Sequence, residues 1–512
     1  MRPLTQDPYS PERWSDIRVS FELVDVDAAE NATAMVTGEA GISELDQTHD
    51  RVDGMDRRLA SLEHNYFVLD GTYILPDEND NGQVGWWSEE ISGEDSTFAT
   101  PQILEFSFTA DQSSIGLTVT FDDRANQYAM DFTIQAYDAT GTIIAEDIAT
   151  NNNQKRYISN MPVDGYRKVR VIFTKTSTPR RRIRIAEVVF GIVQTFDETN
   201  AMEMRLLNEA SPWAESLPSA ELVITVENQD RKYNMINPQG IYKYLQEGQA
   251  MNTAIGVGAT KSSIERVNMG RTYYTSSQAE DNSMTAKLIA YDWFYFMDGK
   301  CRIGMTGTWT VTEAVSAVIA DSGLPIMVNI PTEIGSRIIG KCIPSDATHK
   351  EAIRLIAQAS CSVCFFNRAD ELQFVDMTLG AVADTLDNSN LSDPAKVLVS
   401  DRINIVEITA RDEYGNTEVI YTAANKEPGE IDKIKTVDNP LVISVDTAEW
   451  ILSVLQKRIN YDLQERGNPA REIGDTVKIY DAYDENRNAI ITREEYQYSG
   501  YLRANTEAWE GL

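Results

Sequence analysis

The sequence predicts a mainly β protein with smaller α+β parts, divided into several domains. Apolar and polar residues alternate in short runs over most of the chain, which is the two-residue period of strands. Signals for the start of a helix occur at only three clear positions, all after residue 305. At 512 residues the chain is also too long for a single hydrophobic core.

The N-terminal part begins with a strand and leads into a β-sandwich. In residues 17–26, IRVSFELVDV, the side chains of Val19, Phe21 and Leu23 would share one face. Residues 76–100 are rich in turn formers and predict an exposed loop. From Pro101 to Gly191, short alternating segments separated by turn clusters such as DATGT predict one sandwich domain rather than βαβ units.

Strands are expected again after residue 193. The segment LPSAELVITVENQD reads as a strand that ends in an Asn-Gln-Asp turn. The segments VNMGRTYYTSSQ and SMTAKLIAYDWF read as a strand pair. The end of the chain, from Gly474 to Gly500, is predicted to be β as well.

Three helices and two hairpins are predicted in the second half. Thr310 with Glu313 forms a capping box for a helix that ends at Gly323, and Thr348 with Glu351 repeats the pattern. A third helix is expected to open at Asp446 and Glu449, with these residues facing inward: Ile451, Leu452, Leu455 and Ile459. Hairpin turns are predicted at residues 367–370 and 415–416.

The charge is strongly acidic, with 79 Asp and Glu against 46 Lys and Arg, a formal −33. Duplex DNA would be repelled, so binding through phosphate neutralisation is not expected. Two interpretations stay open: the charge serves solubility, or part of it lines a conduit through which nucleic acid slides. Four cysteines do not make a disulfide scaffold, and neither a leader nor a membrane span is recognised, so we expect assembly in a reducing cytoplasm.

No catalytic residue, cofactor site or metal site is predicted. The three histidines lie in no motif with a nucleophile. The pair Cys361 and Cys364 has zinc or redox spacing, but it follows a helix and enters a strand, so buried apolar packing is favoured. Residues 77–82 resemble the opening of a calcium loop whose twelfth position is Ser88, so a solvated turn is preferred, with an irregular calcium site at 77–89 as the alternative. Because no carboxylate pair can be chosen among 79, a glycan-cleaving enzyme stays an alternative.

Two clusters near the sandwich are candidate binding sites. Trp86 and Trp87 are candidates for stacking on a sugar; adjacent strand residues point to opposite faces, so at most one would face the ligand. The main basic island of the chain is a candidate for docking to an acidic partner, with a charged strand face as the plain alternative; it comprises Arg180, Arg181, Arg182 and Arg184.

The order of segments after residue 217 resembles the hub proteins of phage tails and tail-derived baseplates. The resemblance is carried by LPSAELVITVENQD, INPQGIYKYLQEGQ, ERVNMGRTYYTSS and TAKLIAYDWF, then by DATHKEAIRLIAQASCSVCFF with RADELQFVD, and finally by RGNPAREIGDTVKIYD with ITREEYQYSGYLRANTE. The segment that ends in PRRRIRIAEVVFG resembles galactose-binding, discoidin-like jelly rolls. These resemblances imply β-barrel hub domains, an inserted jelly-roll sandwich and a small helix-strand domain.

The implied domains are residues 1–84 with the first hub strands, 85–193 with the sandwich, 194–305 with a hub barrel, 306–395 with the helix-strand part, and 396–512 with a second barrel. The family resemblance implies a homotrimeric ring at the virion tail tip or baseplate. It would surround the channel for DNA or the tape-measure protein without binding DNA specifically. Its partners would be the distal tail or tube protein, the tape measure, and tip or fibre proteins, with host-surface glycan as a further ligand of the sandwich. A glycan-binding adhesin is the alternative function.

Overall fold

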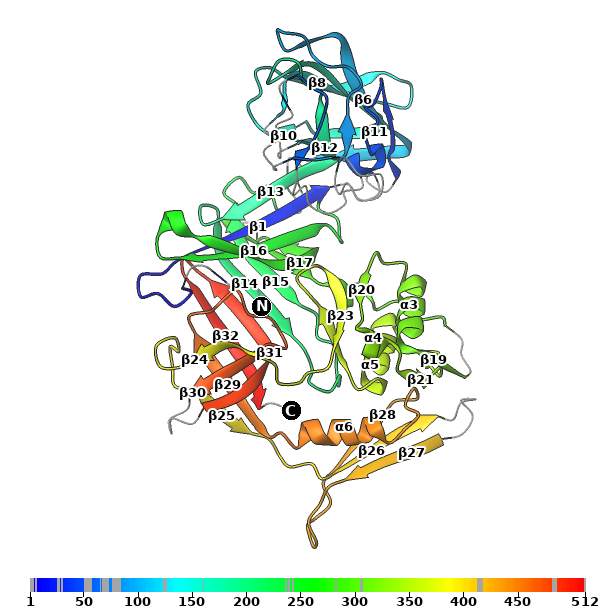
Figure 1. Ribbon diagram of the computed structural model, residues 1–512, viewed down its shortest axis with the longest axis vertical. Helices are drawn as coiled ribbons and strands as arrows, with labels where there is room; N and C mark the ends of the chain where they lie inside the picture. Colours follow the sequence, from blue (N-terminus) through cyan, green and yellow to red (C-terminus); the bar gives the residue numbers. More distant parts are fainter. Residues whose placement is uncertain are drawn as a thin grey trace. The chain divides into compact units, whose positions relative to one another are not determined.

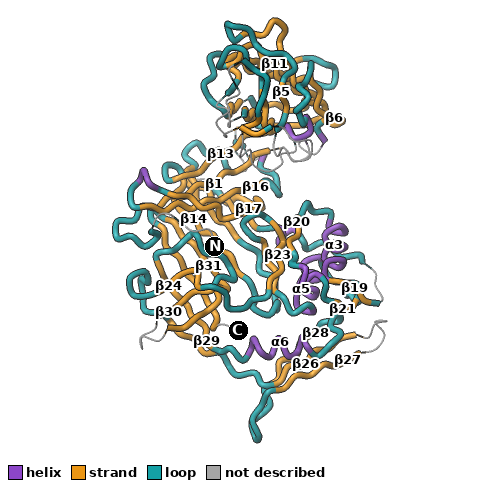
Figure 2. Tube along the Cα trace, in the orientation of Figure 1, coloured by secondary structure: helices purple, strands orange, loops and turns teal. Residues whose placement is uncertain are grey.

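The computed structural model shows two compact units, and each is described by itself (Figure 1). Unit 1 comprises residues 1–20, 195–234 and 250–512; unit 2 comprises residues 21–194 and 235–249. The structure describes the chain except residues 1–3, 5–6, 25–27, 29–30, 50–57, 65, 67–72, 76–83, 123–126, 160, 235–236, 238–239, 242–243, 281–282, 304–306, 412–417, 481–485 and 511–512. Strands dominate both units, which confirms the predicted mainly β class (Figure 2). No helix among the described residues is long and apolar enough to cross a membrane.

Unit 2 is a β-sandwich. One sheet has four strands in the order β10-β7-β12-β5, and the other has five in the order β2-β6-β11-β8-β9. Apolar side chains from both sheets alternate inward and form one aromatic-rich core. The strands are β2 (Thr33–Val36), β5 (Trp86–Trp87), β6 (Thr97–Ser114), β7 (Leu117–Phe121), β8 (Ala129–Tyr137), β9 (Ile143–Ala149), β10 (Arg156–Ser159), β11 (Val163–Thr176) and β12 (Arg184–Val189), with a separate pair β3 (Arg58–Leu59) and β4 (Tyr73–Ile74) and the 3₁₀ turn η1 (Leu45–Thr48).

The predicted boundary at residue 85 cuts through this sandwich. Strand β2 pairs with β6, so residues well before 85 complete the five-stranded sheet. Strand β5 pairs with β12, Arg184 opposite Trp87, although it lies in the segment that was predicted to be an exposed loop. Strand β5 has only two residues and is flanked by many turn formers, so no alternating pattern marks it in the sequence. Its pairing with β12 is what makes it a strand.

A single 13-stranded sheet runs from residue 14 to residue 510. Its main path is β13-β1-β16-β17-β18-β15-β14-β31-β32-β29-β25, and β30 joins β31 to β24. The strands are β1 (Trp14–Val24), β13 (Gly191–Asp197), β14 (Ala201–Glu209), β15 (Glu221–Glu227), β16 (Ala250–Gly258), β17 (Glu265–Gln278), β18 (Thr285–Tyr291), β24 (Val382–Leu386), β25 (Lys396–Val399), β29 (Ile459–Glu465), β30 (Thr476–Tyr480), β31 (Asn486–Tyr498) and β32 (Leu502–Glu510), with η3 (Lys261–Ser263) between β16 and β17. The predicted strand pair β17–β18 and the predicted terminal strands are confirmed.

The two predicted barrel regions, 194–305 and 396–512, share this sheet. Strand β14 pairs with β31 over six residues, from Met204 opposite Tyr498 to Glu209 opposite Arg493. Strands β24, β29, β30, β31 and β32 enclose their own apolar core, which includes Tyr461, Leu463 and Ile479. The sheet therefore joins the two predicted barrel regions into one continuous scaffold.

The helix-strand part packs beside this scaffold within unit 1. Helix α3 (Val311–Ser322) begins at the predicted capping box of Thr310 and Glu313 and ends at Gly323, whose φ of 68° is left-handed. Helix α5 (His349–Ala359) is capped by Thr348 as predicted and buries its apolar face against α3. Short elements complete this part: α2 (Trp293–Phe296), α4 (Thr332–Gly335), β19 (Thr308–Thr310) paired with β21 (Ile338–Gly340), and the sheet of β20 (Met327–Asn329), β23 (Glu371–Val375) and β22 (Val363–Phe366).

Helix α6 (Asp446–Leu455) covers a three-stranded sheet (Figure 1). That sheet consists of β27 (Glu418–Ala424), β26 (Ile405–Arg411) and β28 (Ile434–Asp438). The helix starts at Asp446 as predicted and buries Ile451, but Ile459, predicted to face inward from it, lies in β29. The hairpin at 367–370 is confirmed by β22 and β23. Strands β26 and β27 form the second predicted hairpin, and its turn residues lie outside the described part of the chain.

Candidate functional site

Both predicted sugar-stacking residues are buried in unit 2. Trp86 is 0% exposed and packs in the sandwich core, where its ring lies 5.9 Å from that of Phe173. Trp87 is 1% exposed and packs in a small cluster with Leu59 and Val84. The two indoles do point to opposite faces, but a segment before residue 85 covers the second face as well. The prediction that one of them faces a ligand is therefore wrong.

Three of the four predicted docking arginines bind groups within unit 2. The Arg184 guanidinium forms an ion pair with Glu63, and both side chains are at most 1% exposed. It also lies 4.0 Å from the centre of the Trp87 ring and 4.1 Å from that of Tyr66, so it is held between two aromatic faces. Removing one partner of such a buried pair leaves an uncompensated charge.

The other arginines bind backbone carbonyls. Arg181 donates to the carbonyl of His64 at 2.6 Å, and Arg182 donates to that of Ser88 at 2.6 Å. Arg180 is partly exposed and pairs with Glu94 at the surface. The docking prediction is thus wrong for Arg181 and Arg184, which are buried and fasten preceding segments to the sandwich; for the half-buried Arg180 and Arg182 it stays a prediction. The calcium-like residues 77–82 lie outside the described residues.

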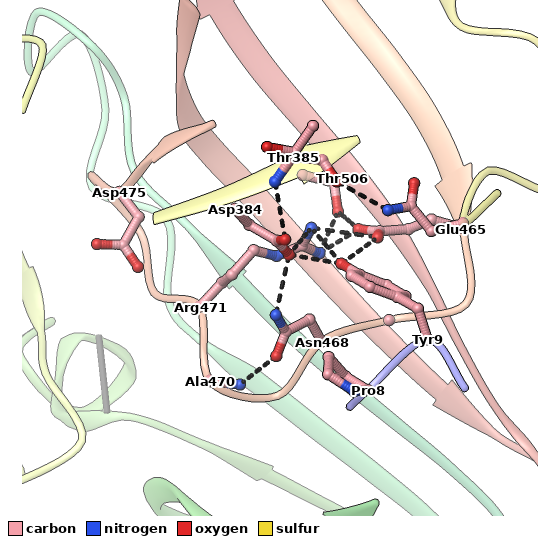
Figure 3. A network of polar contacts seen from close by, with 12 residues as sticks. Pro8, Tyr9, Asp384, Thr385, Glu465, Asn468, Ala470, Arg471, Asp475 and Thr506 are labelled. Atoms are coloured by element: carbon pink, nitrogen blue, oxygen red, sulfur yellow. Dashed lines mark hydrogen bonds and ion pairs between the residues drawn. The ribbon is translucent and has the colours of Figure 1, made fainter. Parts of the chain in front are cut away.

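The densest polar cluster of the described residues lies in unit 1, around Arg471. This side chain is 0% exposed, and it follows β29 in the turn that leads to β30. Its partners come from strands that are distant in sequence: Asp384 from β24, Glu465 from β29, Glu494 from β31 and Thr506 from β32. The cluster therefore ties together four strands of the continuous sheet (Figure 3).

The geometry around Arg471 is that of a fork shared between carboxylates. One terminal nitrogen donates to Glu465 Oε2 at 3.1 Å and to Asp384 Oδ2 at 3.4 Å. The other donates to Glu494 Oε1 at 2.6 Å and to Glu465 Oε1. Thr506 donates to Glu465 Oε1 at 2.6 Å. One cation thus faces three carboxylates, two of which are almost fully buried.

The N-terminal segment enters the same cluster. The Tyr9 hydroxyl donates to Asp384 Oδ2 at 2.5 Å (Figure 3). Arg466 donates back to the Tyr9 carbonyl at 2.8 Å. Arg13 donates to the carbonyls of Arg466 and Leu502, both at 2.6 Å. These bonds fasten the segment before β1 onto the strands that end the chain.

Burial and like charge shift the protonation of this cluster. Burial raises the pKa of Glu494 to about 7, with Glu465 adding to the rise and Arg471 opposing it. Burial would lower the pKa of Arg471, but Glu465 and Glu494 raise it well above its usual value, so it stays charged. Burial also raises the pKa of Tyr9, and this hydroxyl remains a donor. The cluster therefore contains a carboxyl group that titrates near neutral pH.

A cavity of about 790 Å³ lies elsewhere in unit 1, beside α5 and β28. Its cations are already paired: Lys435 with Glu215 at 2.7 Å, and Arg354 with Glu351 at 2.7 Å. Arg411 at its rim lies 3.7 Å from Glu418. Because each positive charge meets a carboxylate, the cavity presents no spare charge to attract an anionic substrate.

The predicted buried packing of the CxxC pair is confirmed for Cys364 only, while another cysteine joins an unpredicted cluster. Cys364 is buried in β22 and Cys361 is half-buried before it; both are free thiols, and burial raises their pKa values. Cys301, Asp321 and His349 converge, with one ligand atom from each within 4.8 Å of the others. Their separations in sequence form no recognisable motif. The Arg471 cluster was missed for the same reason, since its members span residues 9–506.

No protein-family model matches the chain, and no curated protein matches it significantly. Among solved structures, it is similar to the tail protein from Neisseria meningitidis MC58, at 13% identity over 62% of this chain and 94% of that one, with a TM-score of 0.44. It is similar to the 43 kDa tail protein of prophage MuSo2 from Shewanella oneidensis, at 14% identity with the same coverages and a TM-score of 0.42. A family 32 carbohydrate-binding module from C. perfringens NanJ, solved with galactose, covers 35% of this chain and 99% of its own, at 17% identity and a TM-score of 0.20.

Proposed function

We propose that this protein is a structural hub of a phage-like tail. In this role it forms a homotrimeric ring at the virion tail tip or baseplate, connects the tail tube to the tip, and surrounds the channel for DNA or the tape-measure protein. Its neighbours in the particle are the tube or distal tail protein, the tape measure, and tip or fibre proteins. The order of sequence segments after residue 217 first suggests this role.

One observation carries the proposal: a single 13-stranded sheet unites strands from residue 14 to residue 510, on both sides of the inserted sandwich. The buried Arg471 cluster ties the N-terminal segment to the last strands of this sheet. A ring subunit must keep its shape while a rigid tube presses on it, and a continuous, internally fastened sheet suits that task.

The charge of the chain supports a corollary. With a formal −33, a channel lined by part of this surface would repel the DNA backbone and let it pass. The corollary is that the inward face of the ring is more acidic than the outer face. A reconstruction of the ring with a neutral or basic channel would remove the corollary and leave the hub itself intact.

Negative-stain imaging and mass photometry of the full chain, alone and co-expressed with its neighbouring tail proteins, test the proposal. The expected result is a particle of three times the mass of one chain, with a central hole. A chain that stays monomeric in both preparations contradicts it. Binding of one glycan class by that monomer would instead favour the adhesin, and turnover of cell-wall polysaccharide that one carboxylate substitution abolishes would favour the enzyme.

A further inference from the structure

We propose that Cys301, Asp321 and His349 form a binding site for one zinc-class divalent cation. The Cys301 sulfur, a ring nitrogen of His349 and a carboxylate oxygen of Asp321 all lie within 4.8 Å of one another. The three residues belong to unit 1 and lie apart from both the Arg471 cluster and the large cavity. This inference is independent of the hub proposal.

The backbone fixes the three ligands from three different segments. Cys301 donates from its backbone nitrogen to the carbonyl of Ala347 at 3.0 Å, and His349 donates in the same way to Gly299 at 2.9 Å. A short bridge of residues 299–301 against 347–349 therefore sets the thiol and the imidazole side by side. His349 is also the first residue of the capped helix α5, which orients its side chain.

Asp321 reaches the same point from the last turn of α3. Its Oδ2 atom accepts from the backbone nitrogen of Arg302 at 2.8 Å and lies 2.9 Å from His349 Nε2. Gly299 leaves room for the ring, because a Cβ there would meet His349 Nδ1 at 3.2 Å. Asp321, its backbone donor Arg302 and the ring of His349 are thus in place before any ion arrives, which lowers the free-energy cost of binding.

The donor atoms select the class of cation. A thiolate, an imidazole and one carboxylate are the mixed ligands that Zn²⁺ takes, while Mg²⁺ and Ca²⁺ take oxygen atoms. Tetrahedral zinc with its usual bond lengths places ligand atoms roughly 3.3–3.7 Å apart. Side-chain rotations that move the most distant atoms by about 1 Å bring the cluster to that spacing.

Burial indicates how the site opens. Cys301 and His349 are 3% and 6% exposed, while the Asp321 carboxylate lies at the surface. An ion would enter past Asp321, and water would take the fourth position. The bound ion would clamp the segment around Cys301 to the ends of α3 and α5.

The experiment uses the full chain, stripped of metal with a chelator under reducing conditions. Zn²⁺ binding is measured by calorimetry, and Co²⁺ is added as a spectroscopic probe. We expect one ion per chain and a thiolate-to-cobalt charge-transfer band. Cys301→Ser should abolish the band, and Asp321→Asn, at the surface and nearly isosteric, should weaken Zn²⁺ binding by at least the ~10–100-fold that loss of an outer-shell partner costs.

Cys342→Ser is the matched control, because Cys342 is a free, half-buried thiol outside the cluster. It should leave both the stoichiometry and the band unchanged. An unmodified chain that gives no thiolate band overturns the proposal without any mutant, and so does equal weakening by Cys301→Ser and Cys342→Ser. A normal affinity in Asp321→Asn also overturns it, because the His349–Asp321 contact would then be a hydrogen bond only.

Discussion

The protonation of Glu494 gives a prediction that can be worked out from the structure. Its pKa rises from 4.5 to about 7 on burial in the Arg471 cluster, so the folded state holds a proton that the unfolded state releases near pH 4.5. The contribution of Glu494 to the free energy of unfolding is therefore largest at low pH and is lost as the pH rises through about 7. At 1.36 kcal/mol per pKa unit the total is roughly 3 kcal/mol, most of which is lost between pH 5 and pH 8.

The perturbation is Glu494→Gln, which removes the titration and keeps the shape of the side chain. Any constant cost of the amide cancels when one protein is compared at two pH values. Other groups with raised pKa values, such as Asp292, contribute equally to both proteins and cancel as well. We expect the decrease in stability from pH 5 to pH 8 to be smaller in the variant by roughly 2–3 kcal/mol.

Urea unfolding at pH 5, 6, 7 and 8 measures this difference, with the free energy taken from the midpoint and the slope. Each compact unit is expected to give its own transition, and the transition of unit 1 is the one to follow. Glu507→Gln on β32 is the matched control, since that side chain is 45% exposed; it should change stability by less than about 0.5 kcal/mol. Parallel pH profiles for Glu494→Gln and the unmodified chain would refute the reasoning.

Three further predictions concern stability. Arg471→Met should destabilise unit 1 by about 3–5 kcal/mol, because it leaves buried carboxylates without their cation; a loss below about 1 kcal/mol in urea unfolding would contradict the described cluster. In thermal unfolding, Arg184→Ala should lower the stability of the sandwich by a similar amount, whereas Arg180→Ala should cost under about 0.5 kcal/mol. Equal effects of the two substitutions would contradict the described burial of Arg184. Thr310→Ala should cost about 1 kcal/mol, with hydrogen exchange increased in the first turn of α3, and unchanged exchange there would argue against the cap.

Local signals predicted the local structure well. These features depend on residues within a few positions of one another: the Thr310 and Thr348 caps, the strand alternation of the sandwich and the hairpin turn at 367–370. In such segments the sequence period and the capping chemistry decide the conformation, so they can be identified without tertiary knowledge. The helix at 446–455 was predicted too far at its C-terminal end, because Ile459 keeps the apolar period while its backbone joins a strand.

Long-range pairing decided what the sequence could not reveal. Trp86 and Trp87 looked exposed within a turn-rich stretch, but pairing with β12 and cover from an earlier segment bury both. Arg184 read as one face of a strand, and its partner Glu63 lies 121 positions away. The ligands of the proposed cation site are likewise brought together by a bridge between residues 300 and 348. No local period carries information about such contacts.

The anchoring of Tyr9 and Arg13 has a consequence for biosynthesis. Tyr9 and Arg13 contact groups of residues 384, 465, 466, 467 and 502, so residues 9–13 cannot complete their docking until that much later part of the chain has been synthesised. Contacts of such sequence separation fold slowly, and until they form the early strands lack their neighbours. Truncated nascent products should therefore be degraded rather than accumulate, because their sheet lacks the strands that complete it.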